Sequence, residues 1–175
     1  AVIIEPVMFS CGCLKPRDGY HEFLRDLTEE LGIVLIWDEV MTGFRLGPGS
    51  AQGRFGITPD MTTFAKAAGG GYQVAGFGGR ADIMEEIVPP RKEEASKWNS
   101  SAFHGGTYNG HPVAAAAGLK TLEILRDRDV YEHIDRLGDR LFTGLQEVAD
   151  DVGLPVNVQH IGSMGQVYMT DHEIA

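Results

Sequence analysis

Apolar residues in the first forty positions fall into two short runs with an amphipathic segment between them. The runs 2–4 and 33–37 are apolar at consecutive positions, which is typical of strands buried on both faces of a parallel sheet. The segment 19–31 carries apolar residues three and four positions apart, which predicts a helix that Asp18 caps and Gly32 ends. Those apolar residues are Phe23, Leu24, Leu27 and Leu31. Strand, helix and strand in this order predict a parallel βαβ unit.

The middle of the chain alternates between turn-forming and apolar segments. Residues 46–60 are rich in glycine and proline and are expected to form a loop. Residues 72–79 are expected to form a strand, and residues 81–87 a short helix. The segment 89–101 opens with two prolines and continues with charged and polar side chains, which predicts an exposed loop.

The last third of the chain predicts two helices and the start of a second sheet. Pro112 suits the first turn of a helix that runs to about residue 127. The first turns of that helix, 113–118, are made of small residues, so another element is expected to pack closely there. A second helix is predicted by apolar residues at helical spacing, namely Ile134, Leu137, Leu141, Leu145 and Val148. Residues 156–158 and 166–169 are expected to be strands.

Composition and charge narrow the possible functions. The chain has 175 residues, of which 43% are hydrophobic, enough for the core of one ordinary domain. Its formal net charge of -10 disfavours binding to a phosphate backbone, so nucleic acid is not an expected partner. No apolar run approaches the roughly 20 residues of a membrane-spanning helix, so no membrane partner is expected. The sequence opens inside an apolar run, and we expect it to be a piece of a longer chain whose targeting signals lie outside it.

The two cysteines and six histidines do not suggest a metal site or a disulfide framework. Cys11 and Cys13 lack the paired spacing of zinc ligands, and two reduced thiols are the simpler interpretation. No two histidines have the His-Glu-x-x-His spacing. We therefore assign no metal, and reduced cysteines fit a cytoplasmic location.

The first candidate for chemistry is Asp38, which directly follows the second apolar run. Doubly wound sheets bind ligands at the carboxyl ends of their strands, so this carboxylate is expected to face a ligand. Three interpretations are open: an acid for the ring nitrogen of a pyridine cofactor, a magnesium ligand acting with Glu39 in a nucleotide triphosphatase, or a cap for the next turn. The triphosphatase interpretation also needs a Gly-x-x-x-x-Gly-Lys-Ser/Thr loop, which this sequence lacks.

The second candidate is Lys66, which precedes a glycine triplet at 69–71. Its neighbours at 62–65 and 67–68 are small or apolar, so we expect the lysine stem to be enclosed, although most lysines are simply exposed. An enclosed amine is more easily kept neutral, as attack on an aldehyde requires. Pyridoxal phosphate is a cofactor that needs both a lysine for its aldehyde and an acid for its ring nitrogen.

The third candidate is the glycine-rich segment 104–110. A hydrolase oxyanion loop would need a Gly-x-Ser-x-Gly nucleophile elbow, which is absent from the sequence. The hydroxyl of Thr107, the backbone amides of the glycines and the N-terminus of the following helix favour an anion site instead. An ordinary turn before a helix is an equally good interpretation of this segment alone.

Together these residues resemble the class-III aminotransferase family of pyridoxal-phosphate enzymes, of fold type I. Six pieces match the family in order and spacing, namely 4–7, 37–45, 58–66, 69–71, 77–80 and 106–112. The stretch 41–45 is most similar to the glutamate-1-semialdehyde 2,1-aminomutase branch. The resemblance implies an α/β fold: residues 1–128 would be the central part of the cofactor-binding large domain, a mostly parallel sheet flanked by helices. Residues 129–175 would be a linking helix and the start of an α+β C-terminal small domain.

The resemblance also implies a role for each candidate residue. Lys66 would be catalytic, forming a Schiff base with pyridoxal 5′-phosphate and moving a proton once substrate displaces it. Asp38 would also be catalytic, pairing with the protonated pyridine nitrogen, while Val40 would pack on the ring face. Thr107 would bind the phosphate, usually that of the neighbouring subunit, which implies a homodimer with two shared active sites.

Ser10 departs from the family pattern. Many class-III transaminases have an acid there that recognises an α-carboxylate, and the aminomutase branch commonly has asparagine. Ser10 remains a candidate cofactor-binding residue, but neither specificity transfers to this chain. The implied activity is amino-group exchange between an amine or amino acid and a keto or aldehyde acceptor. An intramolecular 2,1-aminomutase and, from another class, the magnesium-dependent triphosphatase using Asp38 and Glu39 stay open, and the segment 89–103 is expected to shape the substrate entrance.

Overall fold

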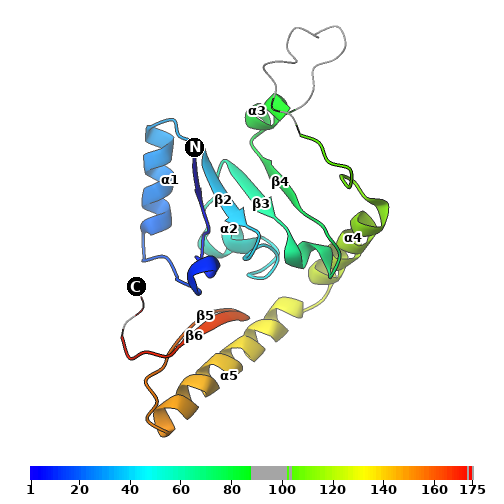
Figure 1. Ribbon diagram of the computed structural model, residues 1–175. Helices are drawn as coiled ribbons and strands as arrows, with labels where there is room; N and C mark the ends of the chain where they lie inside the picture. Colours follow the sequence, from blue (N-terminus) through cyan, green and yellow to red (C-terminus); the bar gives the residue numbers. More distant parts are fainter. Residues whose placement is uncertain (88–101, 103, 173, 175) are drawn as a thin grey trace, which may run out of the picture.

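Four strands form one mixed sheet in the order β1-β2-β3-β4 (Figure 1). In this computed structural model, β1 (Val2–Ile4), β2 (Leu35–Glu39) and β3 (Met61–Phe64) are parallel to one another, and β4 (Gly76–Gly79) is antiparallel to β3. The structure describes residues 1–87, 102, 104–172 and 174. Too few residues join β3 to β4 for a full crossover helix, so β4 returns antiparallel. The predicted α/β fold with a mostly parallel, helix-flanked sheet is confirmed.

Helix α1 (Tyr20–Glu30) joins β1 to β2 and completes the predicted βαβ unit. It begins after Gly19, whose φ of 79° lies in the left-handed region, and no side chain caps it. The predicted cap by Asp18 is therefore wrong. Gly32, with a φ of 63°, follows the end of the helix as predicted. Glycine adopts this left-handed conformation at little energetic cost because it has no Cβ.

The two most buried side chains of α1 are polar, which the apolar spacing did not predict. His21 and Thr28 are buried, whereas Phe23 and Leu31 are exposed. Of the predicted apolar residues, Leu24 is half-buried and packs against the hydrophobic core. The ring Nε2 of His21 bonds to the carbonyl of Pro6 at 2.9 Å, and the Thr28 hydroxyl donates to backbone carbonyls of its own helix. Both side chains can be buried because each finds a hydrogen-bond partner.

The segment 46–60 is not a continuous loop, as predicted, because it contains helix α2 (Ser50–Phe55). The N-terminus of α2 receives a carboxylate from the distant Glu39, whose Oε2 accepts the backbone N–H of Ala51 at 2.7 Å. A cap supplied from twelve residues away leaves no local sequence signal.

The helices and strands predicted for the last hundred residues are present, together with short 3-10 segments, of which η1 and η2 were not predicted. They are the 3-10 segments η1 (Phe9–Cys11), η2 (Lys66–Gly69) and η3 (Glu85–Ile87), the helices α3 (Ala81–Met84), α4 (Pro112–Asp127) and α5 (Val130–Asp151), and the strands β5 (Asn157–Ile161) and β6 (Met164–Tyr168). Strands β5 and β6 form an antiparallel hairpin. Of the strand predicted over 72–79, only the second half is a strand, namely β4. The loop predicted over 89–101 lies outside the described residues.

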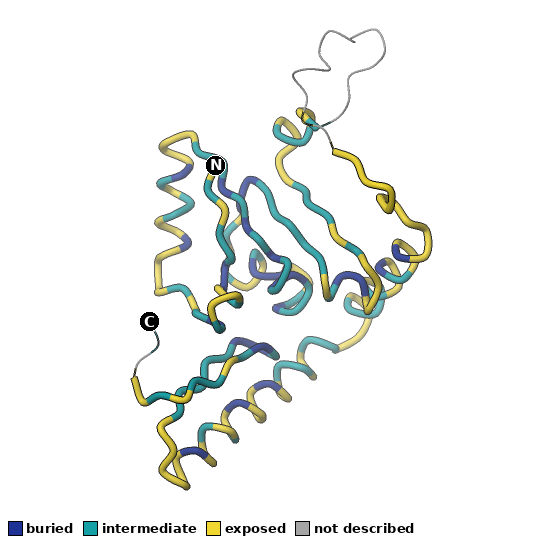
Figure 2. The backbone as a smooth tube through the Cα atoms, in the orientation of Figure 1, coloured by how far each residue is buried: buried dark blue, intermediate teal, exposed yellow. Residues whose placement is uncertain are grey.

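Helix α5 packs on the β5–β6 hairpin through small and aromatic residues (Figures 1 and 2). Phe142 stacks on His160 with ring centroids 5.2 Å apart, and Gly138 lies against the turn at Gly162. The regular leucine and valine stripe of this helix lies mostly on its exposed side, at Leu137, Leu141, Leu145 and Val148. Helical spacing predicted the helix correctly but not the face that it buries.

The main hydrophobic core lies where the hairpin meets the end of the first sheet. Trp37 and Leu35 of β2 pack there with Val7, and the hairpin contributes Ile161 and Met164. This contact fixes the carboxyl end of β2, where the candidate site lies. Within the described ranges, no helix has the length and apolar character needed to cross a membrane.

Candidate active site

The carboxyl end of β2 presents two acids to opposite faces of the sheet, because side chains alternate along a strand. Asp38 is half-buried, and its Oδ1 accepts two hydrogen bonds, from the Val40 backbone N–H at 3.0 Å and from the Thr63 hydroxyl at 2.8 Å. Within the described part of the chain, no donor bonds to Asp38 Oδ2. One carboxylate oxygen is therefore held in place, and the other is available to a ligand.

Glu39 has a structural function at the opposite face. It is 1% exposed, and its Oε2 accepts the Ala51 N–H at 2.7 Å and the Thr42 hydroxyl at 3.1 Å. Its Oε1 accepts the Gln52 side-chain amide at 2.9 Å. A carboxylate with three protein donors has little capacity left for a metal ion. The triphosphatase interpretation therefore loses its second acid, and nothing in the geometry supports it.

Lys66 begins the 3-10 segment η2, directly after β3 and Ala65. Its φ of 46° is unusual for a residue with a side chain, and such strain is common at functional sites. Its Nζ lies against Met41 Sδ, and its side chain is exposed. The prediction of an enclosed lysine stem is wrong, because the inward-facing residues of η2 are Ala68 and Gly69 instead.

Small residues let η2 pack closely against α4, as the sequence predicted. Ala68 is 1% exposed, and Gly118 faces it across the contact. A Cβ added at Gly118 would lie 3.3 Å from the Ala68 carbonyl oxygen and 3.2 Å from a Val74 methyl group. The helix thus supports the segment that carries Lys66 from behind.

The turn after β2 contacts the end of β3 and the start of the Lys66 segment. Arg45 Nη1 donates to the Met41 carbonyl at 2.6 Å, and burial lowers the pKa of the Arg45 guanidinium. The Phe44 ring, on a residue with a φ of 58°, meets the edge of Phe64 at a centroid distance of 6.0 Å. Two side chains of one turn therefore contact the end of β3 and the lysine that follows it.

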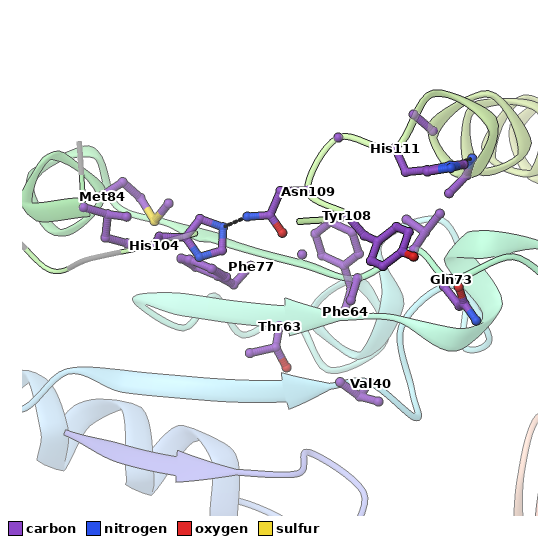
Figure 3. A pocket seen from close by; sticks show the side chains of 17 residues that line it. Val40, Thr63, Phe64, Gln73, Phe77, Met84, His104, Tyr108, Asn109 and His111 are labelled. Atoms are coloured by element: carbon purple, nitrogen blue, oxygen red, sulfur yellow. Dashed lines mark hydrogen bonds between the residues drawn. The ribbon is translucent and has the colours of Figure 1, made fainter. Parts of the chain in front are cut away.

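A cavity of about 730 Å³ lies beside these residues (Figure 3). Val40 and Thr63 line it on the side of the sheet, and His104 and Asn109 line it from the segment that leads to α4. His104 bonds to Asn109 at 3.3 Å and meets the edge of Phe77 at 5.1 Å. Thr63 therefore borders a space large enough for a ligand while holding Asp38 by its hydroxyl.

Thr107 and Ser10 lie on separate loops. Thr107 is exposed in the turn before α4, and the side chain of His111 accepts the Ala114 N–H to cap that helix. Ser10 is exposed in η1, and its backbone N–H donates to Glu5 Oε2 at 3.2 Å. Of the predicted site residues, only Val40 lines the cavity. The pairing of β2 with β3 brings Asp38 and Val40 to the edge of the sheet from which the Lys66 segment continues, whereas Ser10 and Thr107 lie on other loops.

Comparison with known proteins identifies the family of the chain. The family model described as Aminotransferase class-III matches residues 1–175. The chain belongs to the class-III aminotransferase family. Its resemblance to that family is thereby confirmed.

Several similar proteins have names or structures that bear on function. The glutamate-1-semialdehyde 2,1-aminomutase of Halobacterium salinarum is 48% identical over 171 residues, which are 97% of this chain and 36% of that protein. An ω-transaminase from Sphaerobacter thermophilus has a TM-score of 0.85 and 32% identity over 99% of this chain and 38% of its own. A structure described as a transaminase with PLP bound has a TM-score of 0.84 and 28% identity, covering 95% of this chain and 38% of that one. The chain spans somewhat more than a third of the length of each of these proteins.

Sequence patterns did not single out three residues near the candidate site, namely Thr63, Met41 and Arg45. Each contacts a partner on another element or the backbone of a turn, so no spacing rule reveals it. The acid at a strand end and the lysine before glycines gave the only strong local signals.

Proposed function

We propose that the protein containing this chain is a pyridoxal-phosphate-dependent transaminase. It would move an amino group between an amine or amino acid and a keto or aldehyde acceptor. The observation that carries the proposal is the pairing of β2 with β3, in which Asp38 lies opposite Thr63 and Lys66 follows three residues later. A half-buried acid and an accessible amine thus come from adjacent strand ends in a class-III chain.

The residues present fit pyridoxal 5′-phosphate. When bound, this cofactor supplies an aldehyde for an amine and a cationic ring that accepts electrons from the substrate. Asp38 keeps Oδ2 available for the ring N–H because its Oδ1 already accepts two protein donors. At roughly 3–4 Å such an ion pair is worth a few kcal/mol in a partly enclosed site. Val40, which lines the cavity, would support one face of the ring.

Each residue then has a defined task. Lys66 would hold the cofactor through its Nζ and, once released, take and return the proton at the reacting carbon. Asp38 would keep the ring nitrogen protonated, and each 1.4 kcal/mol of that stabilisation corresponds to about tenfold in rate. Thr107 would donate to the cofactor phosphate, and Ser10 would contact the cofactor from η1.

A homodimer with shared active sites is part of this proposal. Thr107 is exposed before α4, and the same helix exposes the apolar side chains of Val113 and Leu119. An exposed anion-binding turn beside apolar residues is what a second copy would cover. We also propose that residues 1–128 belong to the cofactor-binding domain, that residues 129–175 begin the small domain, and that the protein is cytoplasmic.

An aminomutase is the second candidate, and its support is the 48% identity to a glutamate-1-semialdehyde 2,1-aminomutase. It would use the same Lys66 and Asp38 but return the amino group to a neighbouring carbon of the same molecule. Purified enzyme given glutamate-1-semialdehyde and no second acceptor separates the two activities. Conversion of that single substrate would identify an aminomutase, whereas dependence on an added acceptor would identify a transaminase.

The cofactor proposal is tested by borohydride reduction of the full-length protein with pyridoxal 5′-phosphate, followed by peptide mass spectrometry. We expect a pyridoxyl mass on Lys66 and none on Lys120, an exposed lysine of α4 that serves as an internal control. The Lys66→Ala variant should lose the label. Folded protein whose Lys66 stays unmodified would overturn the proposal.

A further inference from the structure

We propose that Thr63 is a positioning residue for Asp38, and that its hydroxyl sets how firmly this carboxylate pairs with the cofactor ring. The inference rests on the proposed function and adds to it a residue outside the predicted set of site residues. It follows from the way β2 and β3 pair at the edge of the site. Thr63 would not touch the reacting atoms, and its effect would pass entirely through Asp38.

The geometry of the contact is specific. The parallel register places Asp38 directly opposite Thr63, and Thr63 Oγ1 lies 2.8 Å from Asp38 Oδ1. An ionised carboxylate only accepts hydrogen bonds, so the hydroxyl is the donor. The Val40 N–H donates to the same oxygen at 3.0 Å. Two donors, one from β3 and one from the residue that follows β2, therefore fix both the location and the rotation of the carboxylate.

Fixing Oδ1 determines where Oδ2 points. Among the described residues, no ion pair involves Asp38, so the two hydrogen bonds to Oδ1 are what orients it. Partners that orient a functional group commonly affect function by large factors, because a loosened group spends little time in the productive geometry. Loss of the Thr63 hydroxyl leaves the Val40 N–H as a single donor about which the carboxylate can rotate.

The neighbouring Thr62 provides a matched control. Its hydroxyl also reaches β2, but it donates to the Trp37 carbonyl at 3.2 Å, on the other face of the sheet. Both threonines are half-buried residues of β3 with one cross-strand hydrogen bond each. Replacement by valine nearly keeps the shape of either side chain and puts a methyl group in place of its hydroxyl. The two substitutions differ in whether the lost bond reaches Asp38.

The experiment compares full-length wild type with Thr63→Val, Thr63→Ser and Thr62→Val. Three quantities are measured: affinity for pyridoxal 5′-phosphate, the pH dependence of the bound cofactor's absorbance, and kcat and KM separately. For Thr63→Val we expect kcat to fall about tenfold, the factor that corresponds to one hydrogen bond of about 1.4 kcal/mol, with a smaller change in KM. The absorbance should titrate at higher pH, because a less firmly held ring cation withdraws less charge from the lysine linkage. Thr63→Ser should restore both, and Thr62→Val should match wild type in both.

The outcomes separate this inference from the proposed function. If wild type shows no cofactor absorbance and no label on Lys66, the proposed function fails and the inference fails with it. If wild type carries the cofactor but Thr63→Val titrates and turns over like Thr62→Val, only the positioning role is refuted. Thermal unfolding verifies that each variant is folded, and Thr63→Ala replaces the valine variant if that one is not. Failure of serine to restore the titration would also refute the role of the hydroxyl.

Discussion

Replacing Asp60, which directly precedes β3, with asparagine should strongly destabilise the protein. Asp60 is 5% exposed just before β3, and its Oδ2 accepts the buried Leu35 N–H at 2.8 Å. Arg25 of α1 lies 3.2 Å from the same oxygen, and Arg80 lies 3.0 Å from Oδ1. One buried acid thus joins the helix, the two central strands and the segment after β4.

The expected magnitude follows from the burial of the partners. The Arg25 side chain is only 17% exposed, so asparagine would leave a largely buried guanidinium without its counter-charge. Removing one partner of a buried pair costs about 3–5 kcal/mol. Asparagine still offers an oxygen to the Leu35 N–H, which favours the lower end, about 3 kcal/mol. Arg80 is too exposed to add much, because solvent screens its interaction.

The effect should depend on pH in a defined direction. Burial by itself would raise the pKa of Asp60, but the Leu35 N–H and the two arginines outweigh burial and hold that pKa below its usual range. A lowered pKa in the folded state means that the stabilisation is fully present above the unfolded value, about 3.9. It is lost as the pH falls through the folded value. The deficit of Asp60→Asn should therefore be constant near neutrality and shrink in acid.

Urea unfolding of the full-length protein at pH 7 and pH 3 measures this effect. Asp82→Asn is the matched control, because Asp82 bonds to the same Arg80 but is exposed. The unfolding midpoint of the Asp82→Asn variant should match that of wild type. The reasoning is refuted if Asp60→Asn unfolds like wild type at pH 7. It is equally refuted if the full deficit persists at pH 3.

Three further predictions concern other parts of the chain. Glu39→Gln should lower the free energy of unfolding by about 2–3 kcal/mol, because a buried amide cannot accept from all three donors. Unchanged stability in urea would contradict the structural function of Glu39. Gly138→Ala should destabilise the protein by about 1–3 kcal/mol, because the added Cβ would collide with the Gly162 carbonyl. Gly144→Ala in the same helix meets open space and should stabilise the protein by up to about 1 kcal/mol. If thermal unfolding showed both variants to be stabilised, or both destabilised, this packing would be contradicted. Burial raises the pKa of the Cys13 thiol to about 11, so a thiol reagent at pH 8 should label the exposed Cys11 in native protein and Cys13 only after denaturation. Equal labelling of both cysteines in native protein, measured by mass spectrometry, would contradict the burial of Cys13.

Local patterns predicted the parts of the site that carry strong local signals. Asp38 follows an apolar run, and Lys66 precedes three glycines, so both could be selected from the sequence. The βαβ unit and the helices after Pro112 also have local causes, namely apolar spacing and proline at a first turn. These features depend on residues within a few positions of each other, which is the range that a sequence pattern covers.

Features that depend on distant partners escaped prediction. Helix α2 begins where Glu39 reaches it from β2, and Thr63 meets Asp38 only because the strands pair in one register. The exposure of Lys66 also depends on tertiary packing, because α4 buries the far end of η2 rather than its first residue. The helical spacing of apolar residues on α5 likewise did not predict which face of the helix packs on the hairpin. In each example the deciding neighbour is more than ten residues away.

The adjacent acids at the end of β2 show how one strand combines folding and chemistry. A motif of two consecutive acids invites the interpretation that both bind the same ion, but alternation along the strand places them on opposite faces. Glu39 accepts three donors and fixes the following turn and α2, while Asp38 accepts two donors on one oxygen and leaves the other oxygen available. The turn that Glu39 fixes contains Met41, which lies against Lys66. The buried acid therefore supports the lysine side of the proposed site, while its neighbour supplies the acid side.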